Sequence, residues 1–201
     1  MVSSCGAGMT KWFGGSQRSE CVKFATQVKI PLCSFTFPNH PSALDYIASG
    51  YSIVPLLILS SSIFYGIIKR SMDSVSFLLL FLVHSPLTSI IKLIVLEDRP
   101  VGSCSSSCGM PSGHSFAAIS TLTFLLLGYA TTSHPGLILL AFALLFPVPW
   151  ARVQLHDHSV SQVVIGSVLG FVWGIIWFKM QPWLTGKLKD LFSRFQNRVK
   201  P

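Results

Sequence analysis

The sequence contains few charged residues for its length. Only 22 of its 201 residues are Asp, Glu, Lys or Arg, which is 11%, whereas soluble domains carry roughly 25%. None of the 52 residues from Pro100 to Ala151 is one of these four types. Because a soluble domain of this size needs a charged surface, the composition excludes an ordinary soluble protein. An apolar fraction of 50% also excludes a chain that is mostly disordered.

Long apolar stretches take the place of the missing charge. A helix needs about 20 predominantly apolar residues to cross a bilayer, and several stretches approach or reach that length. They predict an all-α, polytopic membrane bundle with about five transmembrane helices. Pro147 and Pro149 predict an irregular exit from the fourth span. The predicted spans are Tyr46–Ile68, Ser74–Ile91 with an apolar continuation to Leu96, Ser115–Thr131, Gly136–Trp150 and His158–Phe178.

The two ends of the chain differ from this membrane core, which we assign to residues 46–178. Residues 1–45 have no apolar stretch typical of a cleavable signal peptide, and we expect a loose tail that touches the membrane surface near Phe35 and Phe37. Residues 179–201 contain six basic residues interleaved with aromatic and leucine side chains. This pattern is typical of a basic amphipathic helix at a membrane surface.

The distribution of basic residues predicts the topology. Five spans place the 97–114 and 151–158 loops on one side, and the 69–73 turn and the C-terminus on the other. The second side carries eight basic residues, and positively charged loops stay in the cytosol. We therefore expect the two polar loops to face the lumen or the exterior. The net charge of +8 then reflects topology and not a nucleic-acid partner.

Ionisable residues cluster in three short segments near the predicted span ends, where they are costly and usually functional. Several cations beside few anions favour a phosphate ligand, and two histidines can supply a nucleophile and a general acid. No group of Cys, His, Asp and Glu has the spacing of a metal site, so the pattern predicts phosphoryl transfer without a metal or cofactor. The cations are Lys92, Arg99 and Arg152, the histidines are His114 and His158, and Ser112 with nearby backbone N–H groups adds anion-binding donors.

The three segments together resemble the signature of the type 2 phosphatidic acid phosphatase (PAP2) superfamily. That signature reads Lys-x6-Arg-Pro, then Pro-Ser-Gly-His, then Ser-Arg-x5-His-x3-Asp. The resemblance covers about residues 45–178 and implies a lipid phosphatase that works through a phosphohistidine. It implies His158 as the nucleophile, His114 as the acid that protonates the leaving oxygen, and Lys92, Arg99, Ser112, Gly113 and Arg152 as phosphate-binding residues.

Two positions depart from the signature. Ala151 replaces the serine before the arginine, and Gln162 replaces the aspartate that orients the nucleophile. Gln162 is similar to the dolichyl-diphosphate phosphatase branch, as are the segments 97–100 and 109–112. That branch implies hydrolysis of dolichyl diphosphate to dolichyl phosphate and phosphate, which recycles the lipid carrier of protein glycosylation. It also implies a multi-pass protein of the endoplasmic reticulum membrane whose site faces the lumen.

Other interpretations stay open at this point. The lipid could instead be phosphatidate, a sphingoid-base phosphate or undecaprenyl diphosphate, all substrates of the same chemistry. Ala151 and Gln162 also leave room for a non-catalytic membrane protein that binds lipid phosphates. Taken alone, Lys92 and Arg99 could be interfacial anchors, and Ser112 could be a helix cap.

Three further patterns carry expectations of their own. Cys104 and Cys108 could form a disulfide in an oxidising compartment or stay as thiols. Polar residues at i,i+4 spacing on the second span either reach the diphosphate or form an interhelical hydrogen bond. Small residues every four positions in the last span predict close helix packing. The polar residues are His84, Thr88 and Lys92, and the small ones are Gly166, Gly170 and Gly174.

Overall fold

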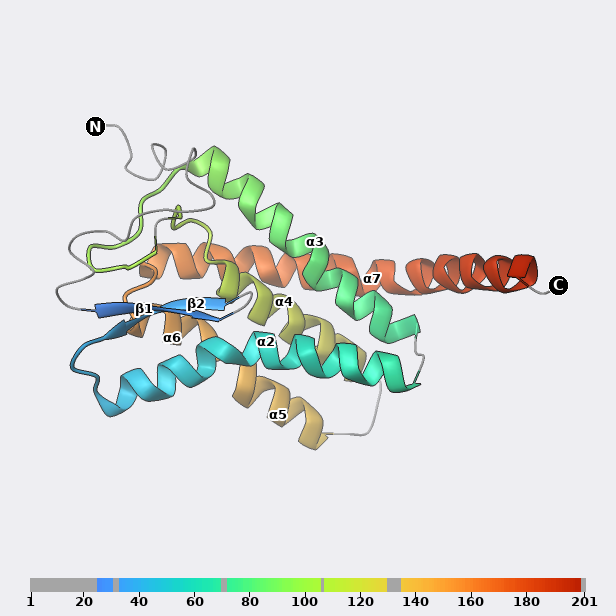
Figure 1. Cartoon of the computed structure of the whole chain (residues 1–201), viewed down its shortest axis with the longest axis horizontal. Coiled ribbons are helices and arrows are strands. Elements are labelled where there is room, and N and C mark those ends of the chain that lie inside the picture. The colour runs from blue at the N-terminus through green and yellow to red at the C-terminus, as the bar shows by residue number, and fades with distance from the viewer. Residues whose placement is uncertain (1–24, 31–32, 70–71, 106, 130–134, 200–201) are drawn as a thin grey trace.

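The computed structural model describes residues 25–30, 33–69, 72–105, 107–129 and 135–199. A short antiparallel hairpin of β1 (Ala25–Ile30) and β2 (Cys33–Pro38) comes first. The hairpin lies toward one end of the molecule, and the last helix extends beyond the others at the opposite end (Figure 1). The helices are α2 (Ala43–Lys69), α3 (Met72–Val95), α4 (Gly113–Tyr129), α5 (Pro135–Leu145), α6 (Val148–Gln154) and α7 (Val160–Val199).

The largely helical membrane architecture is confirmed, and a helical segment lies at each of the five predicted spans, with α5 and α6 together occupying the fourth. Within the described residues, four helical segments are long and apolar enough to cross a membrane, and α4 is a shorter apolar helix. The predicted irregular exit from the fourth span is present. Helix α5 ends at Leu145, and α6 starts after Pro147, whose ring nitrogen cannot donate a helical hydrogen bond. The four segments are Ala43–Lys69, Val75–Val95, Pro135–Gln154 and Val160–Leu191.

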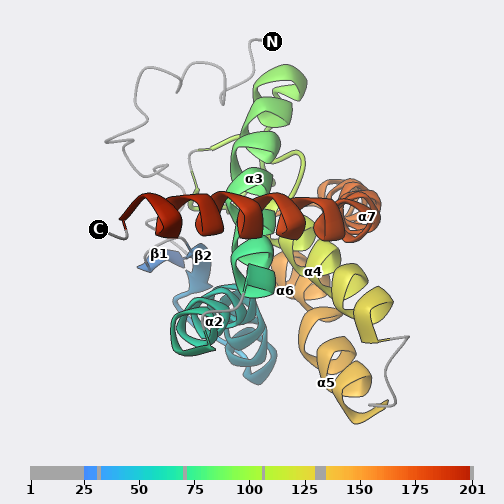
Figure 2. The ribbon, with the colours of Figure 1, turned by 90° about the vertical axis from the view of Figure 1, so that its right-hand side faces the viewer.

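Helix α7 is longer than a membrane crossing requires. Its 40 residues include Pro182 and amount to about 60 Å measured along the helix at roughly 1.5 Å per residue, which is about twice the thickness of the hydrocarbon core. The basic segment that we expected as a surface helix belongs to the same helix as the last span. Its end lies beyond the other helices in Figure 1, and in Figure 2 it runs across the end view of the bundle. The boundary at residue 179 and the cytosolic side of this segment stay predictions.

The small residues of α7 bring it into direct contact with the backbone of α4. A Cβ atom on Gly166 would lie 2.6 Å from the carbonyl oxygen of Ser112, and one on Gly170 would lie 2.5 Å from that of Phe116. Gly174 makes the same kind of approach to Ser120 one turn further on, with 2.6 Å to its carbonyl oxygen. The predicted close packing is confirmed, and Figure 2 shows where α4 lies relative to α7 in the end view.

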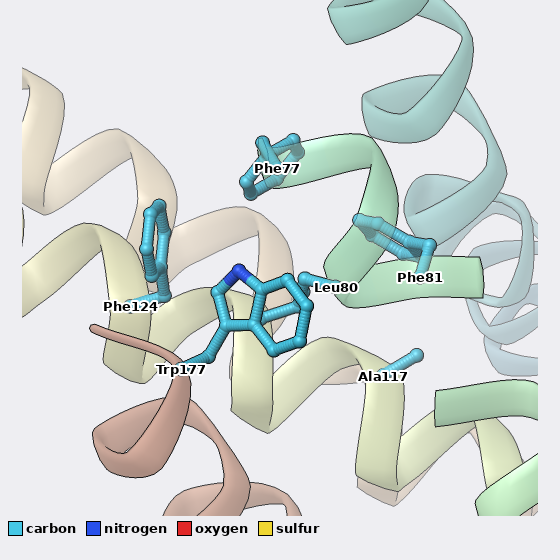
Figure 3. Close-up of a cluster of buried hydrophobic side chains, with 6 residues drawn as sticks. All are labelled: Phe77, Leu80, Phe81, Ala117, Phe124 and Trp177. Atoms are coloured by element: carbon cyan, nitrogen blue, oxygen red, sulfur yellow. The ribbon is translucent and has the colours of Figure 1, made fainter. Parts of the chain in front are cut away.

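An aromatic cluster fixes α3 against this helix pair. Its buried members come from α3, α4 and α7, and Trp177 lies among them with its indole N–H donating to the carbonyl of Ser76 at 3.2 Å. The cluster thus packs the first half of α3 against α4 and α7. The cluster, drawn in Figure 3, consists of Phe77, Leu80, Phe81, Ala117, Phe124 and Trp177.

The hairpin was not predicted from the sequence. Phe35 was expected at the membrane surface, but it is only 5% exposed and packs with Ala151 and Leu155 inside the protein. Phe37 makes an edge-to-face contact with Tyr46, with ring centroids 5.4 Å apart. The part of the expected loose tail that follows residue 24 is thus an ordered structure packed on α2 and α6, and residues 1–24 lie outside the described residues.

Candidate active site

Two turns bring the predicted site residues together at one end of the bundle. Leu96 has a positive φ of 50° and turns the chain out of α3, as residues in the left-handed region do at helix ends. His156 has a φ of 54° between α6 and α7. This turn lets the backbone N–H groups of Asp157 and His158 both donate to the carbonyl of Arg152, at 3.1 and 3.2 Å.

His158 is held by partners on both ring nitrogens. Its Nδ1 lies 3.1 Å from Oε1 of Gln162, and its Nε2 lies 3.2 Å from Nη1 of Arg99. A guanidinium group can only donate hydrogen bonds, so Nε2 must be the acceptor and Nδ1 carries the proton. Burial holds the pKa of His158 well below its usual range, and the charges of Arg99, Arg152 and Lys92 lower it further. The ring is therefore neutral and its Nε2 lone pair faces cations.

The three cations are positioned by backbone carbonyls and one buried ion pair. Lys92 donates to the carbonyl of Cys108 at 2.8 Å, and Arg99 donates to that of Asp157 at 2.8 Å. Arg152 is 1% exposed and forms an ion pair with the Asp157 carboxylate at 2.8 Å. The Nε of Arg152 is buried and has no hydrogen-bond partner among the described residues. A buried donor of this kind favours an anionic ligand.

His114 begins the first turn of α4 and contacts a thiol from the hairpin. Its Nε2 lies 3.3 Å from Sγ of Cys33, which in turn lies 3.4 Å from the carbonyl oxygen of Ser52. Burial raises the pKa of the Cys33 thiol, so the sulfur stays protonated and its S–H can donate to Ser52. The sulfur can then accept a hydrogen bond from an N–H at Nε2 of His114.

Ser112 and Gly113 occupy the N-terminus of α4 in different ways. The Ser112 hydroxyl is fully buried and caps the helix by accepting from the backbone N–H of Ser115 at 3.5 Å, and it also accepts from the Ser115 hydroxyl at 3.0 Å. Its backbone N–H donates to the carbonyl of Gln162 at 3.1 Å, which joins the start of α4 to the start of α7. Gly113 lines the cavity described below, whereas Ser112 does not.

A cavity of about 480 Å³ connects the cations with apolar surfaces of α2 and α3. On α3 its lining runs from Phe81 to Lys92, a distance of about 16 Å at 1.5 Å per residue. Leu82 belongs to the lining and is 58% exposed, so the cavity opens onto the outer surface of the bundle. Its polar lining includes Lys92, Arg99, Arg152, Gly113, His114 and His158, and its apolar lining includes Pro55, Leu56, Leu59, Phe81, Leu82 and Pro86.

Sequence reasoning missed the residues that the hairpin and α2 contribute. Thr36 donates to Asp157 through both its backbone N–H and its hydroxyl, the latter at 2.6 Å, and Ser52 accepts from Arg152 at 3.1 Å. Ala151, where the signature has serine, is fully buried beside Phe35. A polar and apolar alternation in residues 33–38 was the available signal for a strand, but nothing in it indicated a partner more than 100 positions away.

The other expectations have clear outcomes. Cys104 and Cys108 are both disulfide-bonded, and Cys33 is the free cysteine among the described residues. The polar face of α3 formed by His84, Thr88 and Lys92 lines the cavity. His84 also stacks on Phe116 with ring centroids 5.4 Å apart.

Comparison with protein-family models gives a match to the PAP2 superfamily over residues 73–186, more than half of the chain. The chain belongs to the PAP2 superfamily. The matched region contains all three segments that resemble the signature, and the roles of their cations and histidines stay predictions.

Curated relatives of this PAP2 protein come from two groups. Dolichyldiphosphatase 1 of Rhinolophus ferrumequinum is 31% identical over 144 residues, covering 63% of this chain and 60% of that protein. Dolichyldiphosphatase of Saccharomyces cerevisiae is 29% identical over 164 residues, covering 74% and 66%. Lipid phosphate phosphatase epsilon 2, chloroplastic, of Arabidopsis thaliana is 34% identical over 121 residues, covering 58% and 42%. The chain thus spans less than two thirds of the length of these relatives.

The fold has a counterpart among solved structures. A transmembrane PAP2-type phosphatidylglycerolphosphate phosphatase from Bacillus subtilis superposes with a TM-score of 0.59, covering 81% of each chain at 20% identity. At this identity the likeness establishes the shared membrane fold of the two proteins.

Proposed function

We propose that this protein is a membrane lipid phosphatase that hydrolyses a polyprenyl diphosphate, with dolichyl diphosphate as the expected substrate. The observation that carries the proposal is the state of His158. Its Nε2 lone pair points at Arg99, 3.2 Å away, and the ring is kept neutral by burial and by neighbouring cations. A neutral imidazole nitrogen among cations is suited to attack the phosphorus of an anionic substrate.

The proposed reaction has two steps. In the first, Nε2 of His158 forms a bond to the terminal phosphorus while the bond from that phosphorus to the bridging oxygen breaks, and His114 donates a proton to the leaving oxygen. In the second, water attacks the phosphohistidine, His114 accepts a proton from the water, and the N–P bond breaks to release phosphate. Lys92, Arg99 and Arg152 stabilise the equatorial oxygens in both steps.

The cavity supports a lipid substrate. A phosphate bound near Arg99 and His158 can connect with a hydrocarbon chain that leaves along the apolar residues of α2 and α3. Because Leu82 both lines the cavity and is exposed, the hydrocarbon chain of the lipid can pass from the cavity into the bilayer without crossing the polar loops.

Four observations bear on the choice of substrate. The names of the mammalian and yeast relatives favour dolichyl diphosphate, and so does Gln162 in place of the aspartate of the signature. The Arabidopsis relative is named a lipid phosphate phosphatase, and this makes a lipid phosphate the second candidate. We retain dolichyl diphosphate as the expected substrate because the polar face of α3, at His84 and Thr88, extends the polar lining beyond Lys92 toward the apolar end.

We further propose that the site faces the lumen of the endoplasmic reticulum. The basic residues at positions 69–70 and 179–200 favour a cytosolic location for the opposite end of the bundle. Cys104 and Cys108, which are disulfide-bonded, belong to the loop at the site, and disulfides persist in oxidising compartments such as this lumen.

The test is phosphate release by purified protein in detergent with EDTA present. We expect turnover of dolichyl diphosphate to exceed that of dolichyl phosphate, phosphatidate, a sphingoid-base phosphate and undecaprenyl diphosphate. His158→Ala should abolish release. His156→Asn is the matched control, because His156 is exposed and asparagine tolerates its positive φ.

Each contrary result has a defined meaning. A His158→Ala protein that keeps its activity would contradict the phosphohistidine mechanism. Faster turnover of a monoester than of dolichyl diphosphate would replace the expected substrate with a lipid phosphate. Binding of these lipids without release of phosphate would favour the non-catalytic alternative.

A further inference from the structure

The side-chain amide of Gln162 is fully engaged in hydrogen bonds. Its Oε1 accepts from Nδ1 of His158 at 3.1 Å and from the backbone N–H of Ser159 at 3.2 Å. Its Nε2 donates to Oε1 of Glu97 and to the carbonyl of Asp98, both at 2.8 Å. The side chain is 1% exposed, so these four contacts determine which way the amide faces.

A glutamine differs in one respect from the aspartate that the superfamily signature has at this position. A carboxylate presents an acceptor whichever way it rotates, whereas an amide presents an acceptor on one side and a donor on the other. If the amide of Gln162 turned over, its NH2 group would face Nδ1 of His158. The ring would then be driven toward the tautomer with its proton on Nε2, which removes the lone pair that attacks phosphorus.

Glu97 opposes this reversal. Its carboxylate only accepts hydrogen bonds, and its 2.8 Å contact to Nε2 of Gln162 would become oxygen against oxygen if the amide turned over. Hydrogen bonds to a charged acceptor are roughly twice as strong as neutral ones. The carboxylate therefore contributes more to the orientation of the amide than the neutral carbonyl of Asp98 does.

Gly109 closes the remaining space around the amide. A Cβ at this position would lie 2.4 to 2.6 Å from Nε2, Oε1 and Cδ of Gln162, so no larger residue fits without displacing the side chain. The backbone N–H of Gly109 also donates to the carbonyl of Glu97 at 2.7 Å. The same loop thus carries the carboxylate and the glycine that together hold the amide.

We propose that Glu97 is a positioning residue for catalysis, acting through Gln162 to keep His158 in the tautomer that leaves Nε2 unprotonated. The inference rests on the proposed function of His158 as nucleophile. Glu97 does not line the cavity, so its removal should lower kcat and leave KM nearly unchanged. We expect Glu97→Ala to lower kcat by about 10- to 100-fold. A wrong histidine tautomer in a protease triad costs roughly 10⁴-fold. The expected loss is smaller here because Ser159 and Asp98 keep their contacts with the amide of Gln162.

Combining this change with Gln162→Asp gives the sharpest activity test. An aspartate needs no anchor for its orientation, and beside Glu97 it places two carboxylates close together. Glu97→Ala should therefore lower kcat in the wild-type background and leave kcat unchanged or raise it in the Gln162→Asp background. Asp98→Asn, which removes a charge from the neighbouring position and keeps the backbone carbonyl, should lower kcat less than Glu97→Gln does.

A tautomer measurement separates this inference from the proposed function. In protein labelled with 15N at histidine, the His158 signals are identified by their absence from His158→Ala, and 15N shifts distinguish the two neutral tautomers. We expect protonated Nδ1 in the wild type and a mixture in Glu97→Ala. An unchanged tautomer, or equal losses of kcat in the two backgrounds, would overturn the role of Glu97. A wild-type protein with this tautomer but no phosphate release would instead contradict the proposed function.

Discussion

The contact between α4 and α7 predicts that one added methyl group will disturb the site from a distance. In Gly170→Ala the new Cβ would lie 2.5 Å from the carbonyl oxygen of Phe116, against an ordinary contact distance of at least 3.4 Å. The atoms in the way are backbone atoms of a helix and cannot rotate aside. The two helices must therefore separate locally by about 0.9 Å, or one must slide along the other.

The magnitude follows from two opposing terms. Overpacking in a core costs about 1–3 kcal/mol, and alanine in place of glycine in a helix returns about 0.5–1 kcal/mol. At mid-range the two terms leave a net loss of about 1 kcal/mol, which corresponds to a melting temperature lower by roughly 2–4 °C for a chain of this size. Activity should fall more steeply, because His114 lies two residues from Phe116 and a misplacement of about 1 Å can cost about 10²-fold.

Thermal unfolding in detergent and phosphate release measure the two effects in the same preparation. Gly186→Ala is the control, since nothing lies within 4 Å of the Cβ that it adds in the same helix, and it should melt at or slightly above the wild-type temperature. A Gly170→Ala protein with wild-type melting would show that the helices are not in backbone contact. Lower melting with full activity would show that this contact does not position His114.

Two substitutions and one labelling experiment probe other parts of the site. Asp157→Asn leaves the buried cation of Arg152 without its 2.8 Å partner and should destabilise the protein by about 3–5 kcal/mol in thermal unfolding. Arg99→Gln removes a charge that lowers the pKa of His158, so this pKa should rise. The fall of the remaining activity on the acidic side of the pH profile should therefore occur at higher pH. If that part of the profile does not move, protonation of His158 is not its origin. Cys33 is buried and its thiol pKa is raised, so iodoacetamide should modify it slowly in the folded protein and rapidly after unfolding, as mass spectrometry can show.

The helices and the signature residues could be predicted from the sequence because both depend on local patterns. Apolar runs of span length identify membrane helices wherever they occur. Counting the spans then placed the loop around Arg99 and the loop around His158 on the same side of the membrane. In the structure, Nη1 of Arg99 lies 3.2 Å from Nε2 of His158. Pro147 likewise acts on its own helix, and the break that it predicted is present.

The features that could not be predicted from the sequence depend on partners that are distant along the chain. The hairpin packs on the site because Thr36 meets Asp157, 121 positions away, and Gln162 is oriented by Glu97, 65 positions away. A single sequence shows that a carboxylate and an amide are present but does not show that they meet. The continuity of α7 was missed for another reason: hydropathy falls after Phe178 although the helix continues to Val199.

The replacement of a carboxylate by an amide is consistent with the charges around it. Lys92, Arg99 and Arg152 lower the pKa of His158, and a carboxylate in direct contact with Nδ1 would raise it. Coulomb energy falls with distance, so a carboxylate placed on the far side of the Gln162 amide exerts less of this effect. It also repels an incoming phosphate less, which matters more for a diphosphate than for a monoester. The arrangement of Glu97 and Gln162 thus keeps an acceptor at Nδ1 of His158, the proposed nucleophile, while placing the negative charge further from the ring.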